Sequence, residues 1–184
     1  MLAISACEPT YTAKPKSYPR VVLPTKNYIW YDDPDCPFTF KYPSLYTISK
    51  EETFFNETLD IPCWINVSYA PFKQRFHLSY KPINSINTLE KLESEARKLT
   101  NKHIQKADYI DPTLMVNSFG VEGIVLDVGG NAASAMQFYV SDKKDHFLRG
   151  ALYFYSVVNA DSLQPLITSS RSDLDTLLQT IHWK

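Results

Sequence analysis

Proline is concentrated in the first half of the chain, where ten of the twelve prolines lie before residue 83 of 184. Proline lacks a backbone N–H donor and clashes with the preceding helical turn, so a proline-rich segment cannot build long helices. The N-terminal half is therefore predicted to consist of strands and turns. The twelve tyrosines and ten phenylalanines support this prediction, because aromatic side chains favour half-buried, pleated surfaces.

Alternating apolar and polar residues place the first strands. The run 38–42 (FTFKY) alternates with the period of a half-buried strand. Pro43 then turns the chain, and residues 45–48 are predicted to return as the second strand of a hairpin. Two more strands are predicted at 65–69 and 76–80, on either side of Pro71.

A first helix is predicted after Asn87, which would cap it, with Glu90 three positions on as the partner in a capping box. One face of this helix is apolar and the remainder is charged. The apolar face consists of Leu89, Leu92, Ala96 and Leu99.

The second half predicts four strands in an antiparallel meander, followed by a second helix. Strand-like runs lie near 113–116, 121–128, 135–140 and 147–155, and short polar or glycine-rich connections separate the last three. The final helix is predicted to start at Asp161 or Ser162, with Pro165 in its first turn. This order of elements predicts an α+β fold, with a central antiparallel sheet flanked by helices.

Length and charge limit the domain organisation and the partners. A chain of 184 residues fits one domain, which we place at 25–184. Residues 1–24 are interpreted as the remnant of a lipoprotein signal followed by a proline-rich tether. The formal net charge is −1 and no basic stripe is present, which argues against nucleic-acid binding. We find no apolar segment after the N-terminus that is long enough to span a bilayer.

The N-terminus carries a candidate lipidation site. Ile4-Ser5-Ala6-Cys7 resembles a bacterial lipobox, in which small residues precede the cysteine that receives the lipid. Cys7 is therefore expected to carry the lipid anchor, palmitate among its acyl chains. The preceding residues are shorter than a full signal peptide and lack a basic residue, so we expect a longer signal in the precursor. The alternative is an ordinary N-terminus with an incidental cysteine.

The two other cysteines, Cys36 and Cys63, each begin a strand-like run. In an envelope protein an even number of remaining cysteines suggests a disulfide. The alternative is two buried free thiols, because a sequence does not give the distance between them.

The search for catalytic chemistry finds no known constellation. No histidine has metal-ligand spacing to another histidine or cysteine, and no nucleophile elbow is present. Asp32, Asp33 and Asp35 lack the rest of a calcium-binding loop and are interpreted as a turn. We therefore expect no enzymatic activity, no metal and no cofactor.

Two groups of residues remain as candidates for partner binding. Tyr28, Trp30 and Tyr31 could form an aromatic binding platform, or they could cover an open edge of the sheet. His146 and Arg149 could line the mouth of a ligand pocket. Alternatively, Arg149 could pair with a carboxylate across the sheet.

Five segments of the chain carry a resemblance to a known family. They are 11–20 (YTAKPKSYPR), 36–43 (CPFTFKYP), 78–83 (LSYKPI), His103 with 106–108 (KAD), and 146–154 (HFLRGALYF). Through these segments the chain resembles the gliding-motility lipoprotein D family (GldD) of the Bacteroidota from Cys7 almost to its end.

The resemblance implies an envelope lipoprotein, lipid-anchored with its domain in the periplasm, that is required for gliding motility and linked to type IX secretion. It also implies protein partners within that machinery and no catalysis. More faintly, the fold is similar to the Mog1/PsbP-type α/β/α sandwich.

Two functional hypotheses follow from these observations. The first is a non-catalytic accessory or assembly component of the motility and secretion machinery, acting through protein contacts. The alternative is a periplasmic lipoprotein that binds a small ligand or acts as an enzyme. A deep polar pocket joining His146 and Arg149 would favour the second hypothesis.

Overall fold

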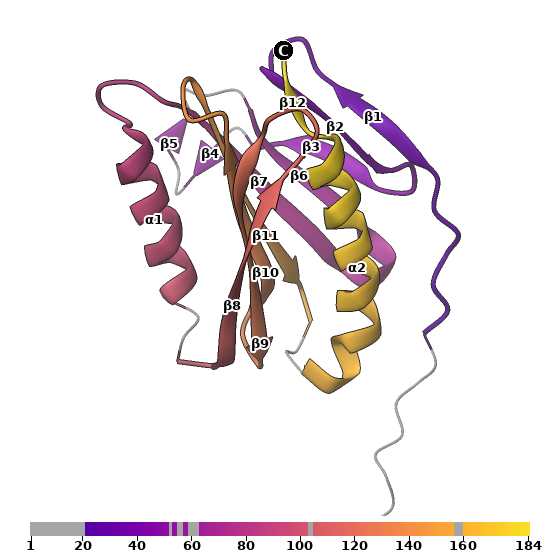
Figure 1. The fold of residues 1–184 in the computed structure, drawn as a ribbon. Helices are drawn as coiled ribbons and strands as arrows, with labels where there is room; N and C mark the ends of the chain where they lie inside the picture. Colours follow the sequence, from indigo (N-terminus) through magenta and orange to yellow (C-terminus); the bar gives the residue numbers. More distant parts are fainter. Residues whose placement is uncertain (1–20, 52, 55–56, 59–62, 103–104, 157–159) are drawn as a thin grey trace, which may run out of the picture.

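A seven-stranded antiparallel sheet forms the middle layer of the molecule, with α1 (Leu89–Asn101) on one face and α2 (Ala160–Thr180) on the other (Figure 1). The computed structural model describes residues 21–51, 53–54, 57–58, 63–102, 105–156 and 160–184. Cys7, most of the predicted tether and His103 lie outside these described residues. The architecture confirms the predicted α+β fold with helices packed on an antiparallel sheet.

The remaining elements follow one another along the chain. They are β1 (Tyr28–Asp32), β2 (Phe38–Pro43), β3 (Thr47–Lys50), β4 (Thr53–Phe54), β5 (Glu57–Thr58), β6 (Trp64–Tyr69), the 3-10 turn η1 (Ala70–Phe72), β7 (Gln74–Pro82), β8 (Ala107–Val116), β9 (Glu122–Gly130), β10 (Ser134–Ser141), β11 (His146–Phe154) and β12 (His182–Trp183).

The large sheet has the strand order β3-β6-β7-β11-β10-β9-β8. Its last four strands along the chain form the predicted antiparallel meander. The predicted strands on either side of Pro71 are β6 and β7, which pair antiparallel with each other. A smaller sheet, β1-β2-β12, packs beside α2, and β4 and β5 form a short pair of their own.

The predicted hairpin between residues 38–42 and 45–48 is wrong. β2 pairs with β1 and β12 in the small sheet, whereas β3 pairs with β6 in the large one. Phe38 and Phe40 are fully buried, and Phe40 stacks on Tyr31 of β1 at 5.0 Å between ring centroids. The buried aromatic side chains of β2 therefore pack between two neighbouring strands, β1 and β12. β3 could not replace either neighbour, because most of its residues are exposed.

Helix α1 starts one residue later than predicted. Its N-cap is Thr88, whose side chain accepts a hydrogen bond from the Lys91 backbone N–H. Asn87 is not the cap, because its carbonyl accepts a hydrogen bond from the Asn84 backbone N–H in the preceding turn. The first hydrogen bond of the helix, from the Leu92 N–H, goes to the Thr88 carbonyl. Leu99, predicted on the apolar face, is 38% exposed, and Thr100 is buried in its place.

Helix α2 begins at Ala160, so Pro165 lies inside the helix and not in its first turn as predicted. The C-terminal half of α2 is buried against β2 and the large sheet through its apolar side chains. These are Leu174, Leu177, Leu178 and, directly after the helix, Ile181.

The two faces of the large sheet bury cores of different sizes. The larger core lies between the sheet, the small sheet and α2, and includes Phe38, Phe138 and Leu152. The smaller core lies under α1, where Leu92 and Ala96 contact Tyr139 and Phe147. Among the described residues, no helix is long and apolar enough to cross a membrane.

Candidate partner-binding site

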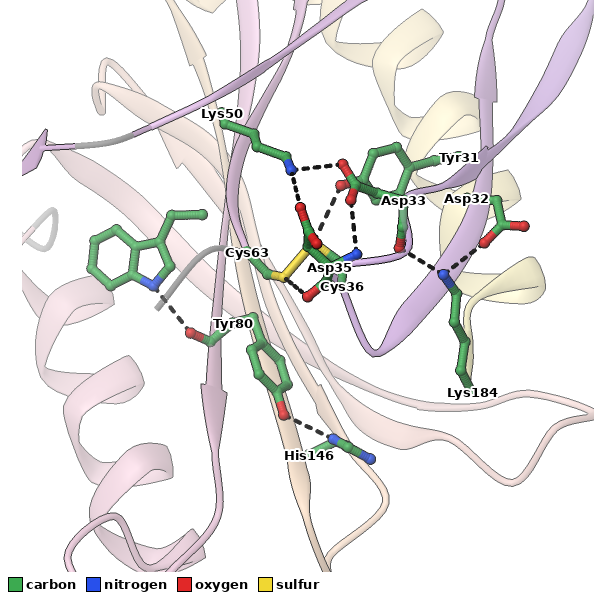
Figure 2. The surroundings of a disulfide bond; sticks show 11 residues. Tyr31, Asp32, Asp33, Asp35, Cys36, Lys50, Cys63, Tyr80, His146 and Lys184 are labelled. Carbon is green, nitrogen blue, oxygen red and sulfur yellow. Dashed lines mark hydrogen bonds and ion pairs between the residues drawn. A yellow bond between two sulfur atoms is a disulfide. The ribbon is translucent and has the colours of Figure 1, made fainter. Parts of the chain in front are cut away.

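Cys36 and Cys63 form a disulfide that joins the start of β2 to the start of β6 (Figure 2). Their Cα atoms lie 5.5 Å apart and both residues are almost fully buried. The predicted disulfide between Cys36 and Cys63 is therefore confirmed, and the alternative of two free thiols is wrong. It ties the small sheet, which carries the candidate aromatic residues, to the large sheet.

The acidic residues beside the disulfide form a turn, as predicted. Lys50 Nζ lies 2.9 Å from Asp33 Oδ2 and 3.0 Å from Asp35 Oδ2. Lys184 Nζ lies 2.6 Å from Asp32 Oδ1 (Figure 2). The hydrogen bond from Lys50 lowers the pKa of Asp33, and the backbone N–H of Asp35 adds to this effect. These carboxylates are therefore each paired with a lysine.

Two of the three predicted aromatic residues support the fold. Tyr31 is buried against Phe40, and its hydroxyl donates to Cys36 Sγ at 3.3 Å. Burial, together with the nearby charge of Asp33, raises the pKa of Tyr31 to about 12. Tyr28 lies on the other side of β1 and donates from its hydroxyl to Asp173 at 2.9 Å. Of the two alternatives left open by the sequence, a single platform of all three residues is therefore not what the structure shows.

Trp30 is the exposed member of the group, and it belongs to a surface that we call the aromatic ledge. The ledge consists of Trp30, His182 and Phe119, with Lys41 at its border. The Trp30 ring meets the His182 ring edge-on at 5.6 Å, and Phe119 stacks on His182 at 4.6 Å. Trp30 is 47% exposed and Phe119 is 53% exposed.

Lys41 adds a positive charge to the ledge. Its Nζ lies 5.0 Å from the centre of the Trp30 ring, in cation–π contact. Within the described part of the chain, no carboxylate lies within ion-pair distance of this ammonium. The ledge thus combines apolar rings with one cation, which suits a partner that presents apolar and acidic groups.

Sequence reasoning missed His182 and Phe119. Phe119 lies in the β8–β9 turn, which is fixed by the Asn117 side chain: its amide donates to the backbone oxygens of Leu178 and Ile181. His182 lies in β12, near the end of the chain. These segments are distant in sequence and no local pattern connects them with Trp30.

His146 and Arg149 do not share a pocket, contrary to the prediction. They are three residues apart on β11, so their side chains leave opposite faces of the sheet. His146 stacks on Trp183 at 4.9 Å, and its Nδ1 lies 2.9 Å from the Tyr80 hydroxyl (Figure 2). Its contacts make it part of the packing between the two sheets.

Arg149 pairs with an amide and not with the carboxylate that sequence analysis offered as an alternative. Its Nη2 donates to Gln137 Oε1 at 2.7 Å, and Thr100 Oγ1 donates to the same oxygen at 3.1 Å. Burial lowers the pKa of the Arg149 guanidinium from its ordinary value. The hydrogen-bonded side chains of Arg149, Gln137 and Thr100 therefore connect α1 to the sheet.

A small hollow beside β11 and α2 does not include His146 or Arg149. It is lined by apolar residues such as Phe154, Leu163 and Ile167. In the described part of the chain, no three His, Cys, Asp or Glu side chains are grouped so that they could hold a metal ion.

Comparison with known proteins gives one family match. The family model described as "Gliding motility lipoprotein GldD" matches residues 8–183. No curated protein sequence matches the chain. Among solved structures, the solution structure of cyanobacterial PsbP (CyanoP) from Synechocystis sp. PCC 6803 is similar, with 11% identity and a TM-score of 0.47. That match covers 88% of this chain and 95% of the cyanobacterial one.

Proposed function

The chain belongs to the gliding motility lipoprotein GldD family, and we propose that it is a non-catalytic accessory of the gliding and type IX secretion machinery. In this proposal the lipid on Cys7 holds the chain to a membrane. The folded domain lies in the periplasm and contacts other proteins of the machinery.

The start of the described chain fits the proposed tether. Residues 21–27 run beside α2 without forming a helix or strand (Figure 1). Lys26 fastens this segment through Ser169 and Asp173 of α2. Between Cys7 and Val21 there are 14 peptide steps, which span at most about 50 Å when extended. Such a tether would let the domain reach partners at some distance from the membrane.

The aromatic ledge is the single observation that carries the proposed protein contacts. Tryptophan is enriched among the residues that dominate binding energy at protein interfaces, and Trp30 is exposed on a rigid strand. The disulfide and the paired carboxylates hold the turn next to this strand. A preorganised surface loses less conformational entropy on binding than a mobile one.

The positions of His146 and Arg149 support a non-catalytic role. Each of the two side chains is engaged in packing or hydrogen bonding within the domain. A shared site for acid–base chemistry would require them on the same face of β11.

A clean deletion in the native host tests the proposed function. We expect the deletion strain to lose colony spreading and to release less type IX cargo into the medium, and the intact gene to restore both. Loss of spreading with normal secretion would restrict the role to motility. Normal spreading together with normal secretion would contradict the proposal.

A further inference from the structure

β8 forms one edge of the large sheet. It pairs with β9 on one side, and in the part of the chain that the structure describes no strand pairs with its other side. The strand is ten residues long, which is longer than most strands in globular proteins. A long open edge is a template for a further strand unless the protein blocks it.

The hydrogen bonds of the β8–β9 turn show which amides point away from β9. The Asn117 backbone N–H donates to the Val121 oxygen across the turn. Because the direction of the amides alternates along a strand, those of Met115 and Thr113 also point to β9. The amides of Val116 and Leu114 therefore point to the open side.

The backbone nitrogen of Pro112 points in the same direction as the Leu114 amide, towards the open side of β8. The N–H that proline lacks is therefore not one that β9 would use. Proline in a sheet is confined to such positions. It limits pairing near the middle of β8 and leaves the backbone of Leu114 and Val116 as the accessible part of the edge.

The accessible part of the edge also carries exposed apolar side chains. Leu114 is 82% exposed and Val116 is 64% exposed, although both lie in a regular strand. They stand on the α1 side of the sheet, because Met115 between them enters the core on the α2 side. Leu114 is paired in register with Ile124, which packs against the α1 core.

The α2 side of the same edge is acidic. Asp111 is exposed and lies directly opposite Asp127 of β9. Arg171 of α2 is bound by Asp127 and also contacts Asp175 at 3.5 Å. Arg171 thus pairs with two carboxylates, Asp127 and Asp175. Asp111 has the same charge as Asp127, its partner in register, and like charges in register destabilise a strand pair. A cation arriving beside Asp111 would relieve this repulsion.

We propose that the β8 edge accepts an extended segment of a protein partner, which adds an eighth strand to the large sheet. The segment places apolar side chains against Leu114 and Val116, and a lysine or arginine beside Asp111. The inference rests on the proposed function in that the protein acts through protein contacts. A second copy of the chain fits less well, because it would bring a second acidic edge to the first.

Photo-crosslinking in the native host tests this site. Val116 is replaced by p-benzoylphenylalanine in the full-length lipoprotein, and Lys98, exposed on α1, is replaced in a separate control strain. We expect an adduct with another protein from position 116 and none from position 98. The cross-linked partner peptide should alternate apolar residues with lysine or arginine.

Two pairs of variants distinguish strand addition from simple proximity. Leu114→Pro removes an open-side N–H that β9 does not use, whereas Leu114→Val keeps that N–H and an apolar side chain. We expect Leu114→Pro to lower the adduct yield about tenfold and Leu114→Val to leave it nearly unchanged. Asp111→Lys should lower the yield, with Asp111→Asn falling between it and the wild type. Thermal unfolding of each purified variant confirms that the domain is folded.

Three results would overturn the inference. They are an adduct that contains only two copies of this chain, an adduct that survives Leu114→Pro undiminished, and no adduct from position 116. The deletion phenotype is scored separately. Loss of spreading on deletion without any adduct would reject the edge as a docking site and leave the proposed function standing. An adduct from position 116, in a host whose deletion strain spreads and secretes normally, would support the edge as a docking site and reject the proposed function.

Discussion

Lys26 Nζ lies 2.6 Å from Asp173 Oδ2 and joins the segment before β1 to the middle of α2. Asp173 is 2% exposed, and it also accepts hydrogen bonds from the hydroxyls of Tyr28 and Tyr46. Burial raises the pKa of Tyr46, and the hydrogen bond to Asp173 raises it further. A single buried carboxylate thus fixes the place where the proposed tether reaches the domain.

Replacing Asp173 should destabilise the domain strongly. Asp173→Ala removes the carboxylate from the Lys26 ammonium, which keeps only its bonds to Ser169, and from the Tyr28 and Tyr46 hydroxyls. Removing one partner of a buried ion pair costs about 3–5 kcal/mol. Urea unfolding of the purified domain measures this loss. Asp173→Asn keeps an acceptor oxygen and should lose less. A loss below about 1 kcal/mol for Asp173→Ala would mean that the carboxylate is not the anchor of this segment.

The disulfide should make a large contribution to stability. It closes a separation of 27 residues, for which the chain-entropy account gives about 3–4 kcal/mol. The double variant Cys36→Ala/Cys63→Ala should therefore unfold at lower denaturant concentration than the oxidised protein. Reduction of the wild type should produce a similar shift. An unchanged unfolding midpoint in both cases would contradict this expectation.

The contribution of Asp33 should depend on pH. Lys50 lowers the pKa of Asp33 below its ordinary 3.8, so the folded state favours the ionised carboxylate. The stabilisation by the ionised Asp33 carboxylate is fully present above pH 3.8, the ordinary pKa of the group. It is lost as the pH falls through the lowered pKa of the folded state. The pair is partly exposed, so the difference in unfolding free energy between wild type and Asp33→Asn should be under about 1 kcal/mol at neutral pH. Urea titrations at neutral and acidic pH should show this difference shrinking. A difference that is constant or grows in acid would refute the assignment.

Trp30→Ala should impair function more than folding. The change removes the exposed ring of the aromatic ledge and a cation–π contact with Lys41 that contributes about 0.5–1 kcal/mol. We expect reduced colony spreading with nearly normal protein levels and thermal stability. Ile86→Ala is the matched control, since Ile86 is 74% exposed in the loop before α1. Equal effects of both variants on spreading would argue against the ledge as a binding surface.

The sequence predicted those parts of the fold that are encoded locally. The alternation of Phe76, Leu78 and Tyr80 reflects burial on one face of β7, so the strand could be recognised from its own residues. The partner of β2 could not, because its pairing with β1 and β12 brings together both ends of the domain. The helix cap was misplaced by one residue because the Asn87 carbonyl is used by the preceding turn, and the first helical hydrogen bond goes to the Thr88 carbonyl.

The candidate site was only partly predictable for the same reason. Trp30 was one of three neighbouring aromatic residues that the sequence grouped as a candidate platform, and the structure shows that it is the exposed one. Its neighbours His182 and Phe119 come from the end of the chain and from a turn, and only the folded structure brings them together. His146 and Arg149 were grouped by proximity in sequence, although their odd separation on a strand places them on opposite faces.

Colony spreading of a deletion strain that carries either the intact gene or its Cys7→Ser variant tests the central claim most directly. If the protein works as a lipid-anchored part of the gliding machinery, the intact gene restores spreading. Cys7→Ser, produced at equal level and folded, fails to restore it and leaves the membrane fraction. Full spreading with a soluble Cys7→Ser protein would show that the anchor is not needed, and would contradict the account.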